Sequence, residues 1–180
     1  REAVATHNLA LVCTERLELT RARALADHYA DISGPIGNHA AKAEAPLVRA
    51  GIELARLNPE AAREHIEDAQ RHLDENNWPM LQAWLRLVVG RMHLINCLST
   101  RDSLELPRAK NNLMAGLGYF EEHGTAWTEE VDPGEAFGWL ATAQALSGHG
   151  KVQETLERGS TLVPLQNAVS HRALLVADCV

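Results

Sequence analysis

The chain has 180 residues, of which 46% are apolar, 23% charged and only 4% aromatic. This length suits one substantial core, and the composition is that of a folded globular protein rather than a disordered one. The formal net charge of −7 comes from 17 basic and 24 acidic residues with no basic run, which argues against nucleic acid as a partner. No apolar stretch reaches the roughly 18 residues needed to cross a bilayer, so we expect no membrane association.

The sequence favours helices throughout. Alanine and leucine dominate, and both are strong helix formers. No segment alternates with the period of two that is typical of a strand, so we predict an all-α protein with about nine helices. In chain order they cover residues 2–15, 18–32, 39–57, 59–75, 79–98, 107–123, 133–146, 151–162 and 165–180.

Proline, glycine and asparagine mark the predicted boundaries. Ser33-Gly34-Pro35 ends the second helix. Asn58 followed by Pro59 fits an N-cap with proline in the first helical position, which opens the fourth helix. The residues from Ser147 to Gly150 form a short turn between the seventh and eighth helices.

The predicted helices come in pairs that share a pattern of large and small residues. It is clearest in the seventh and eighth helices, where large side chains wedge between helices and small ones allow close approach. The residues are Phe137, Leu140 and Ala141, then Val152, Leu156 and Gly159, with Pro164 closing the unit. This pattern resembles a tetratricopeptide repeat, and Trp84 with Leu87 is similar to the opening of another.

The resemblance implies antiparallel helix hairpins stacked as a right-handed superhelix, an α-solenoid. We expect one domain with units at about 2–34, 38–76, 79–124 and 133–164 and a final helix at 165–180. One departure is the spacing of the matched residues Ala22, Ala62, Ala109 and Val152, which follow one another by 40, 47 and 43 residues. Tetratricopeptide units repeat at about 34 residues, and about 40 to 47 is the range of HEAT-type repeats.

Two clusters could hold a metal ion but are better explained otherwise. His65, Asp68 and His72 lie on one face of the fourth helix, yet seven residues separate the histidines by roughly 10 Å. His93 and Cys97 have the required spacing of four but no obvious third ligand. The three cysteines, Cys13, Cys97 and Cys179, form no pattern, so we expect reduced thiols. We therefore expect no metal, no cofactor and no enzymatic activity.

In tetratricopeptide proteins the first helix of each pair lines the concave groove, and the resemblance carries that role to ten residues here. The resulting groove is apolar with two histidines and one arginine, which suits an amphipathic helix or peptide. The residues are His7, Leu11, Val48, Ile52, Arg56, Leu85, Val89, Met92, His93 and Thr142. Alternatively, these side chains simply fill a tightly wound solenoid.

The sequence therefore predicts a protein–protein interaction module or scaffold. Its partner would be another protein, a peptide or a flanking segment of the same chain, and a homo-oligomer is also compatible. The long repeats resemble those of multidomain bacterial signalling and regulatory proteins, which implies a cytoplasmic module of a longer protein. The alternative is a regulatory ligand-sensing domain, with a small molecule held near Trp84, Met92 and His93.

Overall fold

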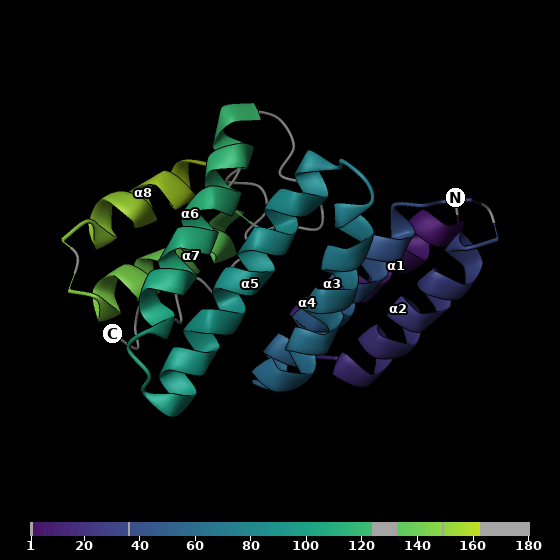
Figure 1. Ribbon diagram of the computed structural model, residues 1–180, viewed down its shortest axis with the longest axis horizontal. Helices are drawn as coiled ribbons and strands as arrows, with labels where there is room; N and C mark the ends of the chain where they lie inside the picture. The colour runs from purple at the N-terminus through teal and green to yellow at the C-terminus, as the bar shows by residue number, and fades with distance from the viewer. Residues whose placement is uncertain (1, 36, 124–132, 149, 163–180) are drawn as a thin grey trace. The chain divides into compact units, whose positions relative to one another are not determined.

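A computed structural model describes residues 2–35, 37–123, 133–148 and 150–162 (Figure 1). These residues form eight helices and no strand, which confirms the all-α prediction. The predicted ninth helix, at 165–180, lies outside the described residues. The helices are α1 (Glu2–Glu15), α2 (Leu19–Ser33), α3 (Ala41–Ala55), α4 (Pro59–Asp74), α5 (Pro79–Thr100), α6 (Glu105–His123), α7 (Pro133–Leu146) and α8 (Val152–Leu162).

Side-chain hydrogen bonds to backbone amides accompany two of the observed helix starts, those of α4 and α6. The side chain of Asn58 accepts a hydrogen bond from the Ala61 amide at 3.3 Å, so the predicted N-cap of α4 is confirmed. Helix α6 begins two residues before the predicted start, because a carboxylate oxygen of Asp102 accepts from the Leu104 amide at 2.9 Å and closes the preceding turn. Helix α5 continues to Thr100, two residues beyond its predicted end.

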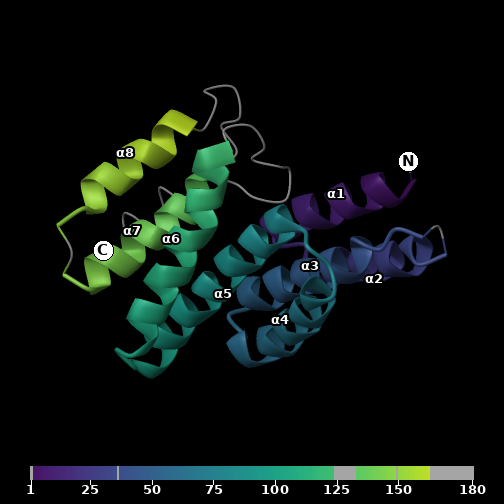
Figure 2. The same ribbon diagram turned by 45° about the horizontal axis from the view of Figure 1, so that its top comes forward.

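The chain packs as two compact units, one ending at Val88 and the other beginning at Val89. The first holds α1 to α4 and the start of α5, and the second holds the rest of α5 with α6 to α8. In the first unit, α1 packs on α2 and α3 on α4, and both helices of the first hairpin contact α3. Figure 2 shows α1, in purple, at the edge of this unit.

The turns that close the two hairpins of the first unit are the same. Leu17 after α1 and Leu57 after α3 both adopt a left-handed φ of 59°. The amide of the next residue then donates back to the carbonyl four residues before the leucine: Glu18 to Cys13 at 2.8 Å and Asn58 to Glu53 at 2.9 Å. This is the Schellman arrangement that ends many helices, usually with glycine at the left-handed position.

The two hairpins also match in their buried positions. Ala10 and Ala22 of the first hairpin are fully buried, and so are Ala50 and Ala62, which follow them by 40 residues. The pairing extends to Ser33 and Leu73, the buried residues near the ends of α2 and α4. Because the turns and the core positions share one offset, the first unit contains an internal structural repeat of 40 residues.

In the second unit, glycines allow close helix crossings. A Cβ atom added to Gly90 of α5 would lie 2.6 Å from Cγ of Leu113 on α6. One added to Gly159 of α8 would lie 2.8 Å from Cβ of Phe137 on α7. The predicted role of Gly159 as a close-packing residue is therefore confirmed. The stacking of all hairpins into one right-handed superhelix stays a prediction.

Candidate interaction surface

In the first unit, most of the predicted groove residues lie in the core. Val48 and Ile52 of α3 are buried, as are His7 of α1 and Leu85 of α5. The ring of His7 lies against Tyr29, with 4.8 Å between the ring centroids. Leu11 is half-buried and Arg56 is exposed. Arg56 is thus the predicted groove residue of this unit whose side chain is most available to a partner.

The four predicted groove residues of the second unit show the same tendency. Met92 is buried, and Thr142 is buried with its hydroxyl donating to the Gly138 carbonyl at 2.9 Å. Val89 and His93 are half-buried. A groove that binds a partner through these ten side chains stays a prediction.

Charged side chains from α2, α3 and α4 meet in a group that we call the arginine cluster. Nη1 of Arg23 lies 3.4 Å from Oε1 of Glu53 on α3 and 3.3 Å from Nε2 of His65 on α4. A single guanidinium of α2 therefore contacts side chains of both α3 and α4. The cluster comprises Arg23, Asp27, Arg49, Glu53, Arg56 and His65.

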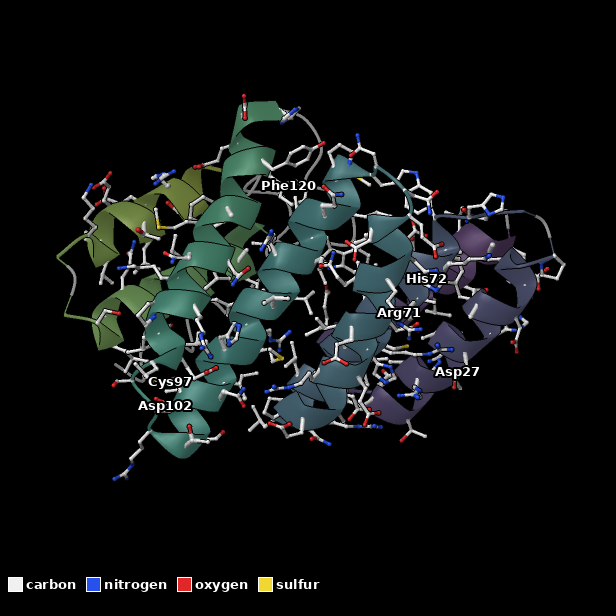
Figure 3. The ribbon with its side chains drawn as sticks, viewed as in Figure 1. Asp27, Arg71, His72, Cys97, Asp102 and Phe120 are labelled. Carbon is white, nitrogen blue, oxygen red and sulfur yellow. The ribbon has the colours of Figure 1, made fainter. Side chains whose placement is uncertain are left out.

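The remaining contacts of the arginine cluster are ion pairs. Arg56 donates to the same oxygen of Glu53 at 2.9 Å. Arg49 donates from two of its nitrogens to one oxygen of Asp27, each at 2.8 Å (Figure 3 labels Asp27). The cluster thus joins the first hairpin to the second through charged hydrogen bonds.

The arginine cluster is positive although the whole chain is acidic. Its three arginines outnumber the two carboxylates, and the side chains of Arg23, Arg49 and Arg56 are 36%, 22% and 39% exposed. The Glu53 side chain is only 8% exposed. Each guanidinium has five N–H donors, more than the contacts above use, so donors remain for another acceptor.

The same positive charge acts on His65. Burial lowers the pKa of His65, and the nearby charges of Arg23 and Arg49 lower it further. Because arginine can only donate, its contact with Nε2 also requires that nitrogen to be unprotonated. His65 is therefore a neutral acceptor that holds Arg23 in place at neutral pH.

The metal-binding alternatives find no support in the described part of the chain. No group of three or more histidine, cysteine, aspartate or glutamate side chains there could hold a metal ion. His72 lies 3.8 Å from Asp68, whereas His65 turns to Arg23 (Figure 3 labels His72 on α4). The predicted face of His65, Asp68 and His72 is thus divided between two different sets of contacts.

His93 has a carboxylate partner that the sequence did not reveal. Its Nδ1 lies 2.6 Å from Glu105 at the start of α6, and Arg108 pairs with the same carboxylate at 3.0 Å. Burial pushes the pKa of Glu105 upward, but the hydrogen bond and charge of His93, together with Arg108, outweigh it and lower the pKa. Burial raises the pKa of the Cys97 thiol, and Asp102 and Glu105 raise it further, so this thiol is not activated.

The residues proposed for a small-molecule pocket have contacts within the protein. Trp84 is buried and lies edge-on to His7, with 6.3 Å between the ring centroids. His93 is held by Glu105, as described above. Nearby in the first unit, the Tyr29 hydroxyl donates to Glu44, and burial together with this contact raises the pKa of Tyr29 well above its ordinary value.

The outer side of α1 exposes apolar side chains. Val4 is 64% exposed, Val12 40% and Leu9 37%. Ala5 is exposed beside them, and no charged residue lies between Glu2 and Glu15 in the helix sequence. We call Val4, Ala5, Asn8, Leu9, Leu11 and Val12 the α1 outer face.

Comparisons with known proteins found no relative of this chain. No protein-family model matches the chain, and searches of curated proteins and of solved structures found no match. The tetratricopeptide resemblance therefore rests on the residue pattern alone. Among the described helices, none combines the length and apolar character needed to span a membrane.

Proposed function

We propose that the chain is a non-catalytic protein-interaction module that binds carboxylate groups of a partner polypeptide at the arginine cluster. The observation that carries this proposal is the set of three partly exposed guanidiniums, from α2 and α3, gathered around one buried and one half-exposed carboxylate. Arginine suits such a partner because its planar donor pair matches the two oxygens of a carboxylate.

The contacts within the cluster support recognition because they fix the arginines before a partner arrives. Glu53 holds Arg23 and Arg56, and Asp27 holds Arg49. A side chain that is already ordered loses less conformational entropy on binding than a free one. The helices that carry the cluster belong to two packed hairpins, and packed hairpins form rigid surfaces for polypeptides in helical-repeat proteins.

The proposal differs from an apolar groove in the side chains that meet the partner. Val48 and Ile52 would need to leave the core to contact a peptide, since both are buried. Arg56 belongs to the same predicted groove set and is already exposed. An acidic segment of a partner could therefore contact Arg56 without any rearrangement of α3.

The test compares two arginines that have similar local contacts. Arg56 pairs with Glu53 and Arg63 pairs with Glu60, each three residues apart on a helix, but Arg63 lies outside the cluster. Wild type, Arg56→Gln and Arg63→Gln would each capture partners from a lysate of the source cells, and the affinity of the purified partner would then be measured by calorimetry. We expect Arg56→Gln to weaken binding about fivefold, or about 1 kcal/mol, because the ion pair it would lose is partly exposed and screened, and Arg63→Gln to leave binding unchanged.

Salt provides a second readout. Salt screens charge-assisted contacts at a partly exposed site, so the affinity should fall as the salt concentration rises from 50 to 300 mM. Equal loss in both variants, binding that is insensitive to salt, or full binding by Arg56→Gln would contradict the proposal. Circular dichroism must first show that both variants fold as the wild type does.

A further inference from the structure

His65 lies where the arginine cluster meets α4, and its side chain is half-buried. Its Nε2 atom is 3.3 Å from Nη1 of Arg23, and that nitrogen of Arg23 also lies 3.4 Å from Oε1 of Glu53. Nε of Arg23 pairs with Asp27 at 3.4 Å. The charged groups that face His65 come from α2, from α3 and from α4 itself, and they are Arg23, Arg49, Glu53 and Glu64. The guanidinium of Arg23 is the one within hydrogen-bonding distance.

Arg23 keeps donors for a further acceptor. Within the described part of the chain, its contacts involve Nε and Nη1, and none involves Nη2. The Arg23 side chain is 36% exposed. An acidic segment that binds at the cluster can therefore place a carboxylate against Nη2, on the same guanidinium that contacts His65.

A carboxylate in that position changes the balance of charge around His65. Without a partner, burial lowers the pKa of His65, and the charges of Arg23 and Arg49 lower it further. A negative charge on the Arg23 guanidinium acts in the opposite direction, because an opposite charge nearby favours the protonated imidazole. Linkage then fixes the sign: a ligand that raises the proton affinity of His65 also binds more tightly to the protonated form.

Protonation also changes the hydrogen bonds that His65 can make. Neutral His65 accepts from Arg23, whereas the protonated ring can only donate. Nε2 of His65 and Nη1 of Arg23 then become two cationic donors 3.3 Å apart, which repel each other. A carboxylate whose two oxygens accept from both donors removes that repulsion. Glu53 and Asp27 continue to hold Arg23, so the cluster stays ordered while these donors turn to the partner.

We propose that the arginine cluster takes up a proton at His65 when it binds a carboxylate of its partner, so that binding strengthens as the pH falls from 7.5 to 5.5. This inference rests on the proposed function, because it concerns the regulation of the same site. It adds that the module distinguishes mildly acidic from neutral conditions. The carboxylates of the partner, whose ordinary pKa is about 4, stay ionised over this range.

The probe is a synthetic peptide of ten glutamates, and calorimetry measures its affinity for the full chain at pH 7.5 and 5.5. The other histidines also make the chain less acidic at pH 5.5, so the wild type is compared with His65→Gln, which keeps that general effect. We expect the affinity of the wild type relative to that of His65→Gln to rise about threefold between the two pH values, the effect of one charge pair at a partly exposed site.

His72→Gln is the matched control. His72 is the other histidine of α4, and it pairs with Asp68 outside the arginine cluster. The variant loses a histidine from the same helix, so its affinity for the peptide should change with pH as that of the wild type does. Circular dichroism at both pH values checks that the two variants are folded.

A second measurement needs no variant at His65. An NMR titration of the wild type, followed at the ring of His65, should give a higher pKa with saturating peptide than without it. This comparison tests the proton uptake even if His65→Gln does not fold as the wild type does.

The outcomes separate this inference from the proposed function. A peptide that does not bind, or that binds Arg56→Gln as tightly as the wild type, contradicts the proposed function and overturns this inference with it. Proton uptake alone is overturned if Arg56→Gln weakens binding but the wild type and His65→Gln have the same pH dependence. The same conclusion follows if the peptide leaves the pKa of His65 unchanged.

Discussion

Leucine occupies a backbone conformation at two turns where glycine is the usual residue. Leu17 and Leu57 have a φ of 59°, and Leu57 is 71% exposed, so burial of its side chain compensates little for the strain. The left-handed conformation costs an L-residue roughly 1–2 kcal/mol, because Cβ approaches the carbonyl oxygen. Because both turns have the same strained conformation, we infer that the fold requires this turn geometry at both places.

Replacing Leu57 with glycine should therefore stabilise the protein. We expect Leu57→Gly to raise the free energy of unfolding by about 0.5–1 kcal/mol, since relief of strain exceeds the added flexibility of the unfolded chain. The measurement is urea denaturation followed by circular dichroism. Leu98→Gly, at an exposed leucine inside α5, is the control and should lower stability by about 1 kcal/mol. A loss of stability in Leu57→Gly would contradict the assignment of strain.

The charge environment of His65 makes stability depend on pH. Its pKa in the folded protein lies below the ordinary 6.5, so below pH 6.5 the unfolded chain binds more protons than the folded one. The stability contributed by neutral His65 is complete above pH 6.5 and is lost as the pH falls toward the lowered pKa. Thermal unfolding between pH 7.5 and 5 should show this loss.

His65→Gln should reduce that loss, because glutamine cannot titrate and its carbonyl can still accept from Arg23. The variant His39→Gln removes an exposed histidine and should keep the pH dependence of the wild type. If the pH profiles of His65→Gln and the wild type coincide, then His65 is not the group that titrates.

Replacing glycines with alanine tests whether two helices pack too closely to accept a side chain. An added Cβ at Gly159 would meet Cβ of Phe137, an atom that cannot move away without its helix. We expect Gly159→Ala to cost about 1–2 kcal/mol of stability despite the better helix propensity of alanine. Gly118 on α6 is the control because its added Cβ would meet nothing within 4 Å, so Gly118→Ala should gain up to about 1 kcal/mol. Chemical denaturation of both variants measures the difference in the free energy of unfolding. Equal gains in stability would show that the contact between α7 and α8 accepts the added methyl group.

The helices could be predicted most accurately where an end has a local cause. Asn58 and Pro59 specify the start of α4 without help from the rest of the fold. Prediction was less accurate at α3, which was expected at 39–57 and spans Ala41–Ala55. Its end is set by the left-handed Leu57, and leucine gives no local indication of that conformation.

The arginine cluster could not be predicted because its members come from three helices. Only Arg56 was among the predicted site residues, and it was selected by resemblance. One signal was present: Glu53 stands between Ile52 and Leu54 in an apolar stretch, and a carboxylate in a core position needs a cationic partner. That signal indicates a partner but does not identify Arg23, which is 30 residues away in sequence.

At the scale of the whole molecule, the two units have cores of their own. Leu47 of α3 and Leu113 of α6 are both fully buried, the first in the unit that ends at Val88 and the second in the unit that begins at Val89. In helical arrays, stability is approximately a sum of local terms and nearest-neighbour terms. A substitution that leaves a cavity in one unit should therefore destabilise mainly that unit.

Hydrogen exchange read by mass spectrometry can localise such an effect. Leu47→Ala should cost about 2–4 kcal/mol and lower the protection of α3 and α4 amides more than that of α6 and α7 amides. Leu113→Ala should give the reverse pattern at a similar cost. Uniform loss of protection across α3 to α7 in both variants would show that the chain unfolds as one cooperative body.

The repeated turn also has a consequence for how such a chain can change in length. Leu17 and Leu57 have the same φ, the same hydrogen-bonding arrangement and the same place relative to the helices before and after them. A genetic crossover that joins the segment ending at Leu17 to the segment beginning at Asn58 would remove 40 residues and retain the turn, with α1 now leading into α4. The reverse event would add 40 residues in the same register. Recombination at this turn would thus shorten or lengthen the protein by whole hairpins, whereas an insertion of one residue would shift every buried position that follows it.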